Sequence, residues 1–96
     1  MANYRLLKKA ADDLEGLYEF GILTFGLEQA DFYYDALLNR LQMIAGSPEH
    51  YPAVDYIRPG YRRCLFGVHS IYYRIDAEDV AIVRILGRQD SAKAFD

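Results

Sequence analysis

The sequence predicts an α+β domain in which a helical hairpin packs on one face of an antiparallel sheet, in the order β-α-α-β-β-β. Three observations support this fold class. Apolar residues recur at intervals of three and four from residue 10 to residue 45, which is the spacing of amphipathic helices. From residue 61 to residue 86, β-branched and aromatic residues dominate short runs separated by turn-like segments. With 96 residues in total, the chain has room for one domain, which we place at residues 1–96.

The N-terminal segment combines a short strand with the first helix. Tyr4 and Leu6 alternate with polar neighbours, which predicts a strand there. Helical spacing begins at Ala10 and continues to Phe25, with acidic residues clustered near the start, where the helix macrodipole favours negative charge. Gly26 predicts the end of this helix, because glycine readily adopts the backbone conformation of a C-terminal cap.

A second helix is expected after almost no loop. Its apolar spacing runs from Ala30 to Ala45 and stops at Gly46-Ser47-Pro48, where glycine and proline oppose further helix. Two helices joined so closely are expected to form an antiparallel hairpin. Residues 47–56 contain two prolines and predict an irregular connection with room for a helical turn.

The last third of the chain predicts a meander of three antiparallel strands. We expect the strands at Tyr61–Phe66, Ser70–Ile75 and Val80–Leu86, joined by turns of two and four residues. These turn lengths pair position 62 with 73, 64 with 71, 73 with 82 and 71 with 84. The more apolar face, which is expected to meet the hairpin, then carries Arg62, Ile71, Tyr73, Arg84 and Leu86, while the other face carries Arg63, Tyr72, Arg74 and Ile85.

Composition and motifs exclude several classes of function. No apolar run reaches the length that spans a bilayer, and no signal-peptide core opens the chain, so we expect a cytoplasmic protein. The single cysteine, Cys64, forms no intramolecular disulfide, and no Cys/His spacing matches a metal site. Because there is no phosphate-binding loop and no nucleophile elbow, the motifs assign no catalytic residue and no cofactor.

The net charge of −3 conceals a segregation of charge along the chain. From Ala10 to Ile57, nine acidic residues accompany one basic residue, Arg40, whereas seven basic and five acidic residues follow from Arg58 onward. This asymmetry favours an acidic partner for the second half, but the acidic whole argues against a dedicated nucleic-acid binder. The later arginines fit three interpretations: a solvated face, a substrate-handling site or a partner-binding surface.

Short motifs follow one another in a specific order. They are Y-R-L and K-K-A-A-D-D-L near the start, F-G-L-E-Q-A between the helices, M-I-A-G-S-P after them, then I-R-P-G-Y-R-R-C, G-V-H-S-I-Y-Y-R and V-A-I-V-R-I-L-G-R-Q-D. In this order and spacing, they resemble the ParE branch of the RelE/ParE toxin superfamily of bacterial type II toxin–antitoxin modules. The resemblance covers nearly the whole chain and implies the β-α-α-β-β-β fold of that superfamily.

The resemblance also distinguishes two activities within the superfamily. The ribosome-dependent ribonuclease branch usually has an arginine where His69 stands, another basic group near Arg88, and a tyrosine or histidine where this chain has Phe95. Phe95 cannot transfer a proton, so the resemblance favours the ParE branch, whose toxins poison DNA gyrase without being nucleases. On the other side, many ParE-like chains have a histidine where this chain has Gly87.

The partners that the resemblance implies are a ParD-like antitoxin and DNA gyrase. An acidic, amphipathic antitoxin segment is expected to fold against the hairpin and to pair its carboxylates with arginines of the sheet. The residues predicted to bind the antitoxin are Arg58, Arg62, Arg63, Arg74, Arg84, Leu14, Tyr18, Tyr33 and Leu37, and those predicted to bind gyrase are Arg88, Lys93 and Phe95. Two alternatives stay open: an mRNA endonuclease that uses Arg63, His69 and Arg88, and a non-toxic module that only binds the antitoxin.

Overall fold

The element order matches the prediction from the sequence. The computed structural model describes residues 3–77 and 79–87 of the chain. Its elements are β1 (Asn3–Leu6), α1 (Lys8–Phe25), α2 (Leu27–Gly46), the 3₁₀ turn η1 (Pro48–His50), β2 (Tyr61–Phe66), β3 (His69–Asp76) and β4 (Asp79–Gly87). Both helices begin two or three residues earlier than their apolar spacing indicated, because the first turn of each is exposed.

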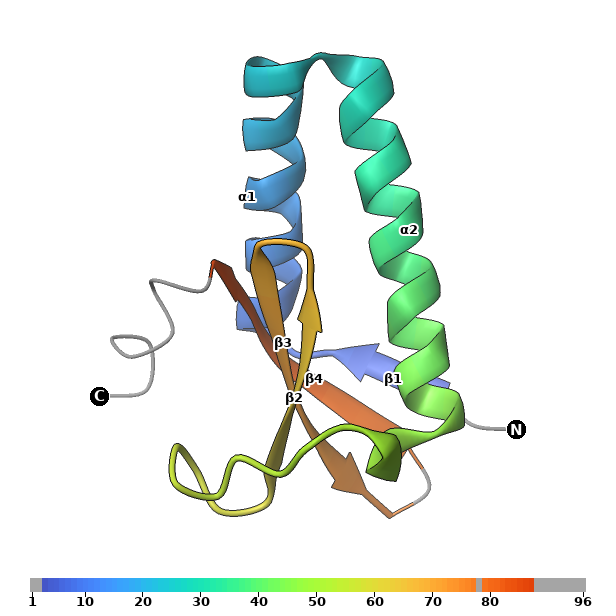
Figure 1. Cartoon of the computed structure of the whole chain (residues 1–96), viewed down its shortest axis with the longest axis vertical. Coiled ribbons are helices and arrows are strands. Elements are labelled where there is room, and N and C mark those ends of the chain that lie inside the picture. The colour runs from blue at the N-terminus through green and yellow to red at the C-terminus, as the bar shows by residue number, and fades with distance from the viewer. Residues whose placement is uncertain (1–2, 78, 88–96) are drawn as a thin grey trace.

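The two long helices form the expected antiparallel hairpin, which rises beyond the sheet (Figure 1). Gly26 separates them with a φ of 92°, a conformation that side-chain-bearing residues rarely adopt. Its N–H donates to the Ile22 carbonyl at 2.9 Å, and its own carbonyl accepts from the Ala30 N–H at 3.0 Å. Near this turn, a Cβ placed on Gly21 would lie 3.4 Å from the Ala30 Cβ, so small residues let the helices approach closely.

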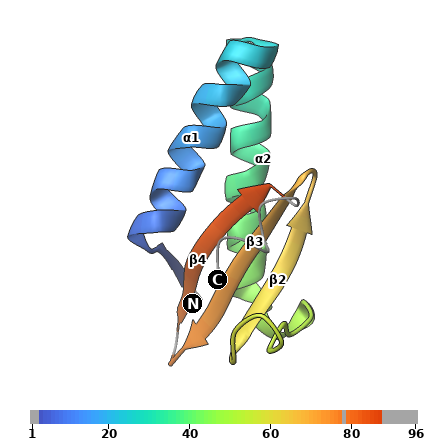
Figure 2. The same cartoon turned by 90° about the vertical axis from the view of Figure 1, so that its left-hand side faces the viewer.

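The sheet has the strand order β1-β4-β3-β2. Strands β2, β3 and β4 form the predicted antiparallel meander, and β1 adds to β4 in parallel orientation, which makes the sheet mixed. The helical hairpin is the crossover that joins the parallel pair, as such pairs require. The helices lie against one face of the sheet and leave the other to a loop (Figure 2).

The register confirms most of the predicted pairs and corrects one. Positions 62 and 73, 64 and 71, and 73 and 82 are partners as expected, but Ile71 pairs with Ile85 and not with Arg84. The register shifts between Tyr72 and Tyr73, because Val83 is an extra residue in β4. The face prediction is therefore wrong beyond this bulge: Ile85 joins the core against the hairpin, while Arg84 and Leu86 belong to the opposite face.

Each face of the sheet contributes to a cluster of buried side chains. The main core, between the sheet and the hairpin, contains Ala10, Leu14, Leu37, Leu41, Ile44, Cys64, Ile71, Tyr73, Val80, Ile82 and Ile85. On the opposite face, Val54 packs with Tyr72 and Leu86. The loop that carries Val54 is held along β2 by hydrogen bonds from the Val54 N–H to the Tyr61 carbonyl (2.8 Å) and from the Arg63 N–H to the Pro52 carbonyl (3.0 Å).

No helix within the described residues is long and apolar enough to cross a membrane.

Candidate functional site

Arg84 is bound to the first helix. Its Nε and Nη2 donate to the Asp13 carboxylate at 2.7 and 2.9 Å, and the same carboxylate accepts the Ile85 N–H at 3.0 Å. Both side chains are largely buried, and the hydrogen bond to Asp13 raises the pKa of Arg84. Asp13 therefore caps the edge of β4 beyond the point where β1 ends, and much of the hydrogen-bonding capacity of Arg84 is used inside the molecule.

Arg62 is also committed to the fold. Its Nη1 donates to the Tyr51 carbonyl at 2.7 Å and to the Glu49 carbonyl at 3.4 Å. The guanidinium thereby fixes the irregular segment after η1 to the helix-facing side of β2. A partner that used Arg62 would compete with these two backbone acceptors.

Arg63 and Arg74 lie on the face that the helices leave uncovered. Arg74 Nε donates to the Asp76 carboxylate at 3.0 and 3.2 Å, and Arg5 approaches the same carboxylate at 2.5 Å. The hydrogen bond from Arg74 lowers the pKa of Asp76. Arg63 Nη2 donates to the Tyr56 hydroxyl at 3.4 Å, and a hydrogen bond with Tyr72 raises its pKa. Both pairs are partly solvent-exposed, so their guanidinium groups are accessible to a partner.

The predicted sheet arginines do not converge on a single site. Arg62 faces the hairpin, whereas Arg63 and Arg74 belong to the other face. Arg58 and Arg84 line a common pocket at the start of α1. An anionic partner therefore meets separate groups of basic side chains, and Arg58 and Arg84 share a concave surface.

Two of the four predicted hairpin contacts are core residues. Leu14 is 5% exposed and Leu37 is fully buried, so in this conformation neither presents its side chain to a partner. Tyr18 is half-buried: its hydroxyl donates to the Asp31 carboxylate, which raises the pKa of Tyr18, and its ring centroid lies 4.9 Å from that of Tyr34. Tyr18 is accessible from the hairpin surface in a way that the two leucines are not.

Tyr33 holds the β2–β3 turn against α2. Its hydroxyl lies 2.7 Å from His69 Nδ1 and 3.3 Å from the Phe66 carbonyl. The turn residue Gly67 has a φ of 56°, and a Cβ there would lie 2.7 Å from the Tyr33 hydroxyl. Burial in this cluster lowers the pKa of His69. Packing and the hydrogen bond to Tyr33 therefore account for the position of the His69 side chain.

Large apolar side chains are exposed in the distal half of the hairpin, which we define as residues 18–34. They are Phe20 (65% exposed), Leu23 (87%), Phe25 (67%), Leu27 (58%) and Phe32 (76%). Apolar surface of this kind marks protein–protein interaction sites more often than isolated apolar residues do. These residues were not predicted as a binding surface from the sequence. The sequence does indicate their exposure, because Phe20, Leu23 and Phe32 fall outside the core spacing of the helices.

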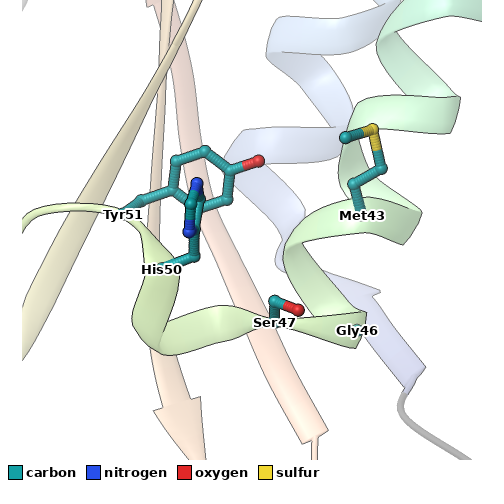
Figure 3. A pocket seen from close by; sticks show the side chains of 5 residues that line it. All are labelled: Met43, Gly46, Ser47, His50 and Tyr51. Atoms are coloured by element: carbon teal, nitrogen blue, oxygen red, sulfur yellow. The ribbon is translucent and has the colours of Figure 1, made fainter.

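A pocket of about 400 Å³ lies where α2 turns into η1, and Figure 3 shows its lining. Met43, Gly46, Ser47, His50 and Tyr51 surround it, and the rings of His50 and Tyr51 meet edge to face at 4.9 Å. The lining includes no carboxylate that could orient His50 as a general base. Within residues 3–77 and 79–87, no three His, Cys, Asp or Glu side chains gather as a metal site.

The residues predicted to contact gyrase lie outside the described part of the chain. Arg88, Lys93 and Phe95 follow the last described residue, Gly87. Their proposed role depends on the sequence alone.

The β-α-α-β-β-β order, with a helical hairpin on one face of a four-stranded mixed sheet, defines the fold class of the chain. A family model described as "ParE toxin of type II toxin-antitoxin system, parDE" matches residues 4–92. The chain belongs to this ParE toxin family.

Two relatives agree with this assignment, and a solved structure has a similar fold. "Toxin ParE1" of Caulobacter vibrioides is 35% identical over 94 residues, which cover 98% of this chain and 97% of the relative. "Toxin ParE1" of Mycobacterium tuberculosis is 33% identical over 86 residues, or 88% of each chain. A chain from the structure titled "Chromosomal ParDE TA system from P. aeruginosa" has a TM-score of 0.79 at 20% identity, covers 91% of this chain and 96% of its own length, and supports the fold.

Proposed function

We propose that this chain is the toxin of a type II toxin–antitoxin pair, that it inhibits DNA gyrase by trapping the state in which DNA is cleaved, and that a ParD-like antitoxin neutralises it in the cytoplasm. The observation that carries the proposal is the match to the ParE toxin family over residues 4–92. Relatives that carry the name Toxin ParE1 align over 97% and 88% of their length, so the proposal applies to most of the chain.

The setting of His69 favours a binding function over the nuclease alternative. Its ring packs against Tyr33 with centroids 5.6 Å apart, its Nδ1 is engaged by the Tyr33 hydroxyl, and burial lowers its pKa. A neutral imidazole in such a cluster lacks the positive charge that phosphate stabilisation requires. The position that would carry an arginine in the ribonuclease branch is occupied here by a residue that holds the β2–β3 turn.

The antitoxin is proposed to bind along the hairpin. Its amphipathic segment would cover Tyr18, Tyr33 and the exposed apolar side chains of the distal half, which replace the buried Leu14 and Leu37 as the apolar contact. Acidic residues of the same segment would pair with the accessible guanidinium groups. Arg58, Arg63 and Arg74 are the strongest candidates, because Arg58 is exposed and the other two are partly exposed on the face without helices. Arg84 is largely buried, and Arg62 donates to two backbone carbonyls.

Purified gyrase provides the test. Addition of the chain is expected to reduce supercoiling and to accumulate cleaved DNA, and addition of the antitoxin is expected to restore supercoiling. Replacement of Arg88 and Lys93 by alanine is expected to reduce the inhibition, whereas Arg5→Gln, in β1, serves as a control that also removes positive charge.

Three results would contradict the proposal. Unchanged supercoiling without cleaved DNA at large molar excess removes gyrase as the target. Cleaved transcripts and loss of translation after expression, without DNA damage, indicate the ribosome-dependent endonuclease instead. Normal growth with intact antitoxin binding indicates a non-toxic module.

A further inference from the structure

A pocket of about 390 Å³ lies at the outer edge of β4, where α1 begins. Segments far apart in the sequence form it: its lining consists of Leu7, Lys8, Lys9, Arg58, Tyr61, Val83 and Arg84. Four of these seven side chains are cationic, although the whole chain has a net charge of −3. Such a concentration of one charge in a concave surface attracts ligands of the opposite charge.

Two neighbouring carboxylates compensate only part of this positive charge. Asp13 is bound to Arg84 at 2.7 Å, but the pair of Lys8 and Asp12, at 3.3 Å, has side chains that are 86% and 61% exposed. The Lys8–Asp12 ion pair is so exposed that it contributes little to stability, and another anion can readily replace Asp12 as the partner of Lys8. The first turn of α1 contains no acidic residue, so the helix dipole adds to the positive potential of the pocket.

The lining also favours one class of ligand. Leu7, Tyr61 and Val83 provide apolar surface between the cationic groups, which suits the methylene stem of a glutamate side chain. A nucleic-acid strand carries a charge about every 3.4 Å and needs a continuous basic track. Here the basic pocket borders the carboxylates of Asp12 and Asp13, so such a track is interrupted.

We infer that this pocket is the docking point for glutamate or aspartate side chains of the antitoxin's acidic segment. The inference rests on the proposed function and specifies its polar contact, with Lys8 and Lys9 as residues that complete the site. α1 has 18 residues, which corresponds to about 27 Å of helix from the pocket at its start, past the exposed apolar side chains, to the hairpin turn at its end. One amphipathic segment of similar length therefore reaches both surfaces.

A synthetic peptide with alternating leucine and glutamate provides a probe of this pocket. In a titration of the ¹⁵N-labelled chain, the glutamate peptide is expected to shift the amide signals of Lys8, Lys9, Val83 and Arg84, with an affinity that falls as salt is added. A peptide with glutamine in place of glutamate is the matched control and is expected to leave these signals unchanged. Shifts confined to other residues, or equal shifts with the glutamine peptide, overturn the inference.

Two variants that each remove one positive charge sharpen the test. Lys9→Gln is expected to weaken the glutamate peptide about two- to fivefold, the effect of an exposed ion pair. Arg5, in β1, pairs with Asp76 and Asp79 at the β3–β4 turn and lies outside the pocket lining, so Arg5→Gln is expected to leave the affinity within experimental error. Equal losses of peptide affinity in both variants indicate a general effect of net charge and contradict a specific binding site in the pocket.

Further ligands distinguish carboxylates from phosphates. Inorganic phosphate and a single-stranded oligonucleotide, titrated under the same conditions, are expected to bind more weakly than the peptide. A stronger shift of the same amides by the oligonucleotide makes the pocket a nucleic-acid contact and overturns the inference. Antitoxin that binds Lys9→Gln and the unsubstituted chain equally also overturns it but leaves the proposed function intact, whereas antitoxin that binds neither contradicts the proposed function itself.

Discussion

The two halves of the helical hairpin differ sharply in what surrounds them. At the base, Ala10 and Leu37 are fully buried against the sheet. In the distal half, whose end rises beyond the sheet (Figure 1), Leu23 is 87% exposed and Phe32 is 76% exposed, although both are as apolar as the core residues. The apolar residues of these helices therefore serve two purposes. The base stabilises the fold, and the distal half leaves an apolar surface available to a partner.

Matched leucine substitutions in the two halves test this comparison with the largest expected effect. Leu37→Ala removes a fully buried side chain and is expected to lower the free energy of unfolding by about 2–5 kcal/mol. Leu23→Ala, on the same hairpin, is expected to change it by less than about 0.5 kcal/mol. Urea denaturation measures both values. Similar losses in the two variants would show that the distal half is packed in solution.

The carboxylate that caps β4 gives the next largest effect. Asp13→Ala removes the acceptor of Arg84 and of the Ile85 N–H, and is expected to lower the free energy of unfolding by about 1–3 kcal/mol. Asp12→Ala, whose exposed partner is Lys8, is the control, with an expected change below about 0.5 kcal/mol. If Asp13→Ala is as stable as the control, the edge of β4 does not depend on this cap.

The contact between Tyr33 and His69 predicts a smaller, pH-dependent effect. Burial lowers the pKa of His69 below the ordinary value of 6.5. At a pH between the pKa of the folded chain and that of the unfolded chain, the unfolded chain therefore binds more protons than the folded chain. Stability is therefore expected to decrease as the pH falls through about 6.5. His69→Gln is expected to reduce this slope in denaturation curves between pH 7.5 and 5, while substitution of the exposed His50 by glutamine keeps it. An unchanged slope in His69→Gln would assign the pH dependence to other groups.

Polar substitutions in the distal half are expected to leave stability nearly unchanged and to affect binding. Phe20→Ser combined with Leu23→Ser removes apolar side chains that are 65% and 87% exposed. The free energy of unfolding is expected to change by less than about 1 kcal/mol. The affinity for the antitoxin is expected to fall about tenfold or more, as for apolar residues at the centre of an interface. Calorimetric titration checks this, and unchanged affinity would place the interface elsewhere.

The sequence predicted the element order well because its signals are local. Helical spacing from Ala10 to Ala45, the stop at Gly26 and the turn at Gly67-Val68 each depend on a few neighbouring residues. The parallel orientation of β1 did not follow from these patterns, because it depends on where the hairpin returns the chain. The bulge at Val83 was also missed, since no turn residue marks it, and it moved Arg84 and Leu86 to the other face.

The candidate site was harder to predict than the fold. The sequence predicted Leu14 and Leu37 as antitoxin contacts, although their spacing is that of core residues. It did not predict the exposed Phe20 and Leu23. No role was predicted for Lys8 and Lys9, because acidic residues follow them closely in the sequence. Their role becomes visible only when Arg58 and Arg84, far along the chain, are brought beside them. Surfaces of this kind are properties of the tertiary structure, so a single sequence contains little signal for them.

Amide hydrogen exchange of the chain, free and in complex with its ParD-like antitoxin, tests the central claim most directly. The account predicts that binding slows exchange in residues 18–34 of the distal hairpin and around Lys8, Lys9 and Arg84, while core amides near Ile71 and Ile82 keep the slow exchange that they show in the free chain. Protection confined to the uncovered face of the sheet, with the distal hairpin and the basic pocket unchanged, would contradict it.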